Sequence, residues 1–247
     1  MVKGFKYDIR GDGLTVQYEY LIFNVLVISG PLVFGSFRPF YFIDSWRPAL
    51  ISVVTVGTPY IIWDVLVTGR HWHFNPAYVS GLYIGGLPVE EWLFFITVPF
   101  ACLFTWEMIL RYSKHATLKW IITLRPYLYI IPAAGLVLFL AGLEYTGLAL
   151  FFSGLAVFTD QIMRTDLILR RPFYLYLAIV MIFTVIFNGF LTARPVVLYG
   201  EDYQIGLRIF TIPVEDFAYG LSLIYLNTVL FERLKRGRRL PHTKAEI

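Results

Sequence analysis

An acidic tetrapeptide occurs twice in the chain, each time where a long apolar segment begins. Its copies read PVEE at 88–91 and PVED at 213–216. Proline suits the first position of a helix and acids are favoured in the first turn, so these could be ordinary helix-end charges. Ionisable groups at membrane depth are costly and often functional, which gives a second interpretation, a catalytic site. The candidate catalytic acids are Glu90, Glu91, Glu215 and Asp216.

A neutral carboxylic acid is a proton donor, and aromatic faces attract the cation that protonation creates. Aromatic residues are dense around both copies of the motif, although an interfacial aromatic belt would account for most of them singly. Acids and aromatic rings in apolar surroundings indicate proton-initiated rearrangement of a hydrocarbon. The aromatic residues are Trp63, Phe74, Tyr78, Tyr83, Trp92, Phe94 and Phe95 near the first copy and Tyr199, Tyr203, Phe210, Phe217 and Tyr219 near the second.

The composition excludes a water-soluble globule. Of the 247 residues, 57% are hydrophobic and 15% are charged, against about 25% charged in an average globular domain. The mean hydropathy is +0.64, and long runs such as 21–37 and 145–158 carry no charge. One cysteine, Cys102, excludes a disulfide framework and a cysteine metal cluster. The polar first residues do not resemble a cleaved signal peptide. From the composition and the uncharged runs we predict a polytopic membrane protein.

Seven segments are apolar over the roughly 20 residues that a membrane helix needs, which predicts an all-α fold with seven transmembrane helices. They lie at about 18–37, 46–68, 88–110, 122–143, 145–163, 172–192 and 213–231. Most Lys and Arg residues fall on the side of the C-terminus, so the positive-inside rule places the C-terminus in the cytoplasm and the N-terminus outside. We interpret the basic tail as an anchor near acidic lipid headgroups rather than a nucleic-acid site.

The acidic motif belongs to an internal repeat with an offset of 125 residues. The paired identities are Leu66 with Leu191, Tyr78 with Tyr203, Gly81 with Gly206, Ile84 with Ile209, Glu107 with Glu232 and Arg111 with Arg236. An even number of spans separates equivalent spans, so we expect two parallel three-helix repeats joined by a connector helix, a 3+1+3 arrangement. The expected divisions are a polar N-terminal segment at 1–17, a first repeat at 18–112, a connector at 113–143, a second repeat at 144–236 and a basic tail at 237–247.

Both halves of the chain resemble the integral-membrane lycopene cyclase domain, of the heterodimeric or fused type. The resemblance is carried by IIWDVLVT, FNPAYVSGLYIGGLPVEEWLFF, NGFLTARPVVLY, GLRIFTIPVEDFAYG and LIYLNTVLFE. It implies that the two halves correspond to two subunits joined in one polypeptide. It also implies an enzyme of carotenoid biosynthesis, a lycopene β-cyclase that converts the acyclic ends of lycopene to β-ionone rings, giving γ-carotene and then β-carotene.

The resemblance implies roles for particular residues. A neutral acid of the doubled motif would protonate the terminal double bond, the next double bond would close the ring, and a carboxylate would remove a ring proton. Nothing is oxidised or reduced overall, so no cofactor and no metal are expected. The expected partners are lycopene, γ-carotene, the lipid bilayer and other carotenoid-pathway enzymes. The candidate substrate-binding residues are Asp64, Asn75, Asn188, Trp63, Tyr78, Trp92, Tyr203 and Phe217.

Parallel repeats would place all four acids in one outer layer of the membrane. A polyene standing across the membrane would then present one end to the acids at a time. Forming two rings would require the polyene either to reorient or to bind bent within the membrane plane.

A small-solute transporter is the alternative, because small sugar transporters share the parallel 3+1+3 arrangement. Transport needs a polar path between the halves, whereas the acids here lie near one face only. A retinal-binding seven-helix protein would need a lysine in the last span, and 211–231 contains none. His71 and His73 could bind a metal, but no third ligand lies at a useful spacing, so we favour an interfacial loop.

Overall fold

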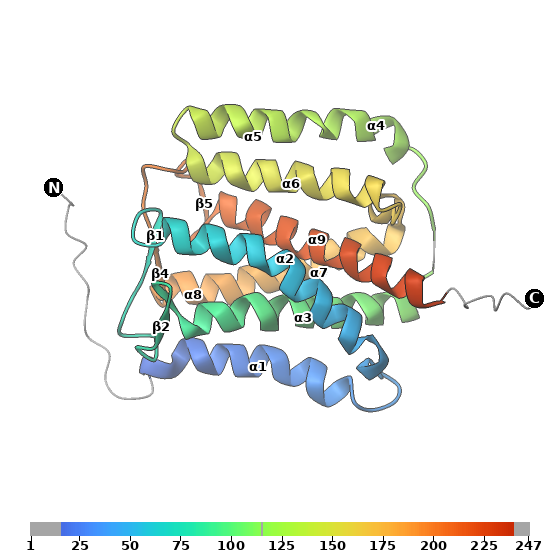
Figure 1. The fold of residues 1–247 in the computed structure, drawn as a ribbon, viewed down its shortest axis with the longest axis horizontal. Coiled ribbons are helices and arrows are strands. Elements are labelled where there is room, and N and C mark those ends of the chain that lie inside the picture. The colour runs from blue at the N-terminus through green and yellow to red at the C-terminus, as the bar shows by residue number, and fades with distance from the viewer. Residues whose placement is uncertain (1–15, 115, 240–247) are drawn as a thin grey trace, which may run out of the picture.

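The computed structural model describes residues 16–114 and 116–239, and it is mostly helical, with the helices running side by side in one bundle (Figure 1). The first fifteen residues of the chain and residues 240–247 of the expected tail lie outside the described residues. The helices are α1 (Glu19–Phe34), α2 (Trp46–Val67), α3 (Val89–Tyr112), α4 (Ile121–Leu128), α5 (Ile130–Leu140), α6 (Glu144–Ile162), α7 (Arg171–Phe183), α8 (Gly189–Ala193) and α9 (Val214–Arg239). A π-helical turn, Thr184–Asn188, connects α7 to α8.

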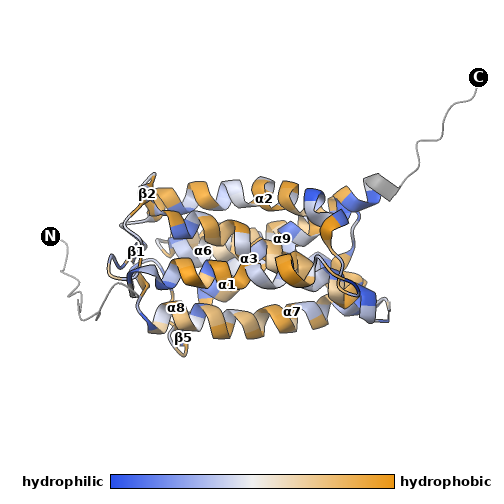
Figure 2. Cartoon of the chain, turned by 90° about the horizontal axis from the view of Figure 1, so that it is seen from below, coloured by the Kyte–Doolittle hydropathy of each residue, from blue (hydrophilic) through white to orange (hydrophobic). Residues whose placement is uncertain are grey.

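Each of the seven predicted spans is helical, and within the described residues four helical stretches are long and apolar enough to cross a membrane. Hydrophobic residues extend along the helices, and hydrophilic residues gather toward the two ends of the bundle (Figure 2). A backbone in hydrocarbon must satisfy its own hydrogen bonds, which helices do. The four stretches are Ile43–Val67, Val89–Tyr112, Ile121–Leu140 and Arg171–Ala193.

Short strands, which the sequence did not predict, lie at the end of the bundle where α3 and α9 begin (Figure 1). They form three antiparallel pairs. Two of the pairs are tight hairpins that lead directly into α3 and α9. The hairpins are β2 (Tyr83–Ile84) with β3 (Leu87–Pro88) and β5 (Arg208–Ile209) with β6 (Ile212–Pro213), and the third pair is β1 (Trp72–Phe74) with β4 (Val197–Tyr199). The prolines of the acidic motifs thus end a strand before starting a helix.

Element boundaries recur at the offset of 125 residues. Helices α1 and α6 begin at Glu19 and Glu144, and α3 and α9 begin at Val89 and Val214. Strands β1 and β4 are also equivalent, and they pair with each other in a register that sets His73 opposite its own equivalent, Leu198. Pairing of two equivalent strands about their own centres is what a two-fold relation produces.

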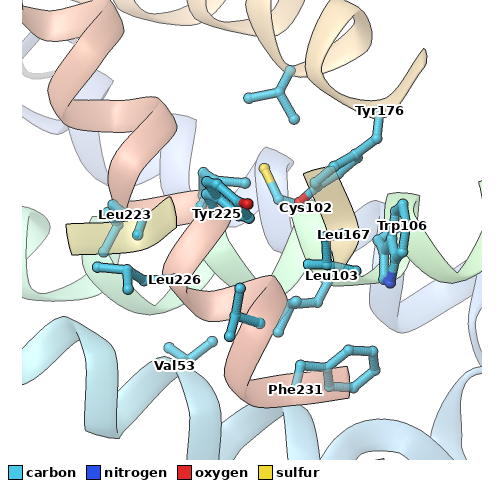
Figure 3. Packing of buried hydrophobic residues seen from close by; sticks show 14 of the residues in the cluster. Val53, Cys102, Leu103, Trp106, Leu167, Tyr176, Leu223, Tyr225, Leu226 and Phe231 are labelled. Atoms are coloured by element: carbon cyan, nitrogen blue, oxygen red, sulfur yellow. The ribbon is translucent and has the colours of Figure 1, made fainter. Parts of the chain in front are cut away.

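Helix α9 occupies the middle of the bundle, where it packs against α2, α3, α6 and α7. Its Leu223, Leu226 and Phe231 join a buried cluster with Leu103 and Trp106 of α3 (Figure 3). Helices α1 and α6 lie toward the outside, and only α6 carries a further layer, formed by α4 and α5 (Figure 1).

The α5–α6 contact depends on glycine. A Cβ atom at Gly135 would come within 2.6 Å of the Gly147 carbonyl oxygen, and one at Gly154 within 2.2 Å of Pro132 Cδ. Small residues let helix backbones approach closely in lipid. Helix α5 is therefore held tightly against α6.

Candidate active site

An apolar cavity of about 350 Å³ opens among α1, α3, α7 and α9, and the second acids of both motifs, Glu91 and Asp216, reach it. Both lie in the first turn of their helices and are almost wholly buried. A third carboxyl group, Asp64 of α2, also lines the cavity. The other polar side chains of the wall are Tyr20, Trp72, Thr105, Tyr145, Thr184, Asn188, Tyr199 and Tyr219.

Glu91 is paired with a second carboxyl group. Its Oε2 accepts a hydrogen bond of 2.5 Å from the Tyr20 hydroxyl, and its side chain lies beside that of Asp64. Asp64 Oδ1 in turn accepts hydrogen bonds from Trp72 Nε1 at 2.6 Å and Thr68 Oγ1 at 3.0 Å. Two neighbouring carboxyl groups repel each other when both are ionised, so a proton held by either one would stabilise the pair.

Asp216 has a different set of neighbours. It accepts hydrogen bonds from the Tyr145 hydroxyl, from the Tyr199 hydroxyl at 2.6 Å and from Asn188 Nδ2 at 2.7 Å. Three donors aimed at one carboxyl group stabilise its ionised form. Asn188 is the last residue of the π-helical turn, a feature that is frequent at functional sites.

The first acids of the motifs, Glu90 and Glu215, do not line the cavity. Oε1 of each accepts a backbone N–H of the preceding loop, from Ser80 at 2.7 Å and from Ile205 at 2.8 Å. Ser80 and Ile205 are themselves equivalent at the offset of 125 residues. These two acids therefore fix the hairpins onto the helix starts, and the structure separates them from the pair that faces the cavity.

A family model described as lycopene cyclase matches residues 17–109 and, separately, residues 144–234, which is more than half of the chain. This chain belongs to the lycopene cyclase family. Its role is that of a lycopene cyclase in carotenoid biosynthesis. No curated protein and no solved structure matches it. The two matched regions of the cyclase begin at residues close to the starts of α1 and α6.

Two of the eight candidate substrate-binding residues of the cyclase, Asp64 and Asn188, line the cavity. Asn75 instead accepts a hydrogen bond from the Ala77 N–H at 3.1 Å, and Trp92 Nε1 donates to the Ile84 carbonyl oxygen at 3.1 Å. Phe217 is buried outside the cavity wall.

Tyr78 and Tyr203 take part in contacts between the two halves of the cyclase. The Arg194 guanidinium lies 5.4 Å from the centre of the Tyr78 ring and pairs with Glu19. The Arg70 guanidinium lies 4.9 Å from the centre of the Tyr203 ring and pairs with Glu144. We call each Arg–Glu–Tyr group a clasp. The glutamates and tyrosines of the two clasps are equivalent at the offset of 125 residues, whereas the arginines are one position out of register. The remaining residue, Trp63, packs against His71 and Phe139.

His71 is part of the second clasp rather than a metal site. Its Nε2 lies 3.0 Å from Glu144 Oε2, and its ring stacks on Tyr203. Burial lowers the pKa of His71 below 6.5, although Glu144 opposes this. The neutral ring can donate from Nε2, which leaves Nδ1 buried without a partner in the described residues. Among residues 16–114 and 116–239, no group of three His, Cys, Asp or Glu could hold a metal ion.

Sequence reasoning missed Tyr20, Tyr145 and Trp72, which hold the cavity acids. Tyr20 and Tyr145 are identical residues at the offset of 125, so the repeat itself carried the signal for them. Trp72 reaches Asp64 because the chain turns back after α2 into β1, and its spacing from Asp64 gives no comparable indication.

Proposed function

We propose that this cyclase is a lycopene β-cyclase, an isomerase that forms γ-carotene and then β-carotene. One observation carries the proposal: Glu91 and Asp216, one acid from each half of the chain, face the same apolar cavity. An acid and a base on either side of a hydrocarbon end group are what proton-initiated ring closure requires.

In the proposed reaction the Glu91–Asp64 pair supplies the proton. It adds to the terminal double bond and leaves a tertiary cation, which the next double bond attacks to close the six-membered ring. Asp216, with its three hydrogen-bond donors, then removes a ring proton. One proton is added and one is removed, so atoms and charge balance without an oxidant. The Trp72, Phe94 and Tyr219 rings of the wall stabilise the intermediate cation.

We further propose a fold of two parallel three-helix repeats joined by α4 and α5, with the acids on the outer side and the C-terminus in the cytoplasm. The recurring helix starts and the mirrored clasps support the repeats. The excess of basic residues on the C-terminal side supports the orientation. Lycopene and γ-carotene would reach the site from the bilayer.

The test is expression of the chain in cells that accumulate lycopene, with pigment analysis, followed by the purified protein in vesicles loaded with lycopene. Cyclic carotenes formed without added flavin or nicotinamide are the expected result. Unchanged lycopene in both settings would overturn the proposal, and lycopene that moves between vesicles unchanged would favour the transporter alternative.

A further inference from the structure

The cavity continues from the acids along a groove between α1 and α7. Leu26 and Phe34 of α1 and Phe187 of the π-helical turn line it, yet these side chains are 67%, 58% and 37% exposed. A residue can be both lining and exposed only where the cavity opens on the outside of the bundle. This flank is apolar (Figure 2), so the groove opens sideways to lipid.

The repeat has a second copy of this groove, between α2 and α6, and there it is filled. Tyr60 of α2 is fully buried, with its ring centre 4.7 Å from that of Phe152 in α6 and 4.9 Å from that of Tyr219. Its hydroxyl lies 2.8 Å from Ser222 Oγ. Helix α5 also covers this side, where Phe139 contacts Trp63.

Three equivalent positions carry smaller residues on the α1–α7 side. Tyr60 corresponds to Val185, and Phe152 to Val27. The third pair is Leu155 and Gly30, and Gly30 lines the open groove. Of the three smaller residues, Val27 and Gly30 line the groove, so the space that Phe152 and Leu155 fill on the other side is open here.

We propose that the α1–α7 groove is the single polyene-binding site of the chain, that it admits substrate sideways from the bilayer, and that Gly30 and Gly220 determine which chains fit. This rests on the proposed function. Both glycines line the cavity, and a Cβ atom at either would meet no atom within 4 Å. Their missing side chains are therefore part of the space that the polyene occupies.

Phe23 and Phe187 meet across the groove next to the acids, with ring centres 5.5 Å apart. Phe187 precedes Asn188, which holds Asp216. Both rings line the cavity, so they would contact the polyene close to its reacting end.

A single groove also decides how two rings are made. With the second copy filled, γ-carotene has to leave the groove and return with its other end toward Glu91. The bound intermediate therefore exchanges with the bilayer between ring closures.

The test compares Gly30→Phe and Gly220→Leu with the control Val25→Phe. Val25 also lies on α1, is 57% exposed and is not part of the cavity wall. Each protein is supplied with lycopene and with a short synthetic polyene that carries the same acyclic end group. The groove variants should lose roughly 10-fold to 100-fold of their activity on lycopene, as expected for a misplaced substrate. They should keep most activity on the short polyene, and the control should keep both.

Elution of each detergent-extracted variant as a single folded species guards against misfolding. If the wild type is active and the groove variants cyclise lycopene normally, the groove does not bind the polyene. If the wild type itself is inactive, the proposed function is wrong instead. Unlabelled γ-carotene added during conversion of labelled lycopene should dilute the label in β-carotene. Undiluted label would contradict the exchange between the two ring closures.

Discussion

The two halves of the chain agree at the acid end and differ along the helices. At the acid end Glu90 and Glu215 accept equivalent backbone N–H groups, and Tyr20 and Tyr145 hold equivalent acids. We call the boundaries between α1 and α7 and between α2 and α6 the two seams. The α1–α7 seam is a groove, and the α2–α6 seam is a core filled by Tyr60 and its neighbours. The acid ends of the two halves therefore match, while the packing along the helices differs and leaves a groove on one side only of the described seams.

The acids themselves have diverged in their partners. Glu91 faces Asp64, whose equivalent is Gly189, so the second half cannot form the same carboxyl pair. Asp216 faces Asn188, whose equivalent is Trp63. Each half has thus gained one polar residue that the other lacks. This asymmetry is what an acid and a base working on one substrate need.

The largest effect is expected from Glu91→Gln. It removes the proposed proton donor, and general acid catalysis typically contributes about 10²-fold to 10⁴-fold in rate. Cyclisation of lycopene in vesicles should fall by that range while the protein still elutes as a single species.

Glu90→Gln is the matched control for this change. An amide oxygen can still accept the Ser80 N–H, so most activity should remain. If Glu90→Gln is as inactive as Glu91→Gln, the division of roles between the two acids is wrong.

The filled seam can be tested through stability. Tyr60→Ala empties a fully buried site and removes a hydrogen bond to Ser222, and large aromatic truncations cost about 3–5 kcal/mol. Thermal unfolding in detergent should shift strongly downward. The equivalent change, Val185→Ala, should cost much less because Val185 is only partly buried; equal shifts would mean that the two seams are packed alike.

Sequence reasoning located the helices and the acid layer because both depend on patterns that survive without tertiary contacts. Apolar length predicted the seven helical segments, and the repeat predicted that acids from both halves lie together. It could not separate Glu90 from Glu91, since that depends on a hairpin whose N–H groups take one acid and leave the other. Nor could it find the groove, because the groove depends on small residues of helices that are far apart in the sequence and meet only in the folded chain.

His71 gives a smaller, pH-dependent test of the second clasp. Its pKa is lowered in the folded chain, so below about pH 6.5 the unfolded state binds a proton that the folded state does not. Stability contributed by neutral His71 is therefore present above that pH and is lost as the pH falls through the folded pKa. The melting temperature should drop when the pH is lowered from about 7.5 to about 5.5. In the His71→Gln variant this drop should be smaller. An unchanged pH dependence in this variant would assign the effect to other groups.

The smallest effect is expected from the first clasp, which has no histidine. Arg194 and Glu19 are 45% and 20% exposed in their side chains, and exposed ion pairs contribute about 0–1 kcal/mol. Arg194→Ala should therefore lower stability slightly, by less in high salt, because exposed charges are screened. Arg70→Ala should cost more, since Arg70 shares Glu144 with the buried His71 and lies over Tyr203. Equal losses in the two variants would mean that His71 adds nothing to its clasp, and that the halves are held together by two equivalent contacts despite their divergence elsewhere.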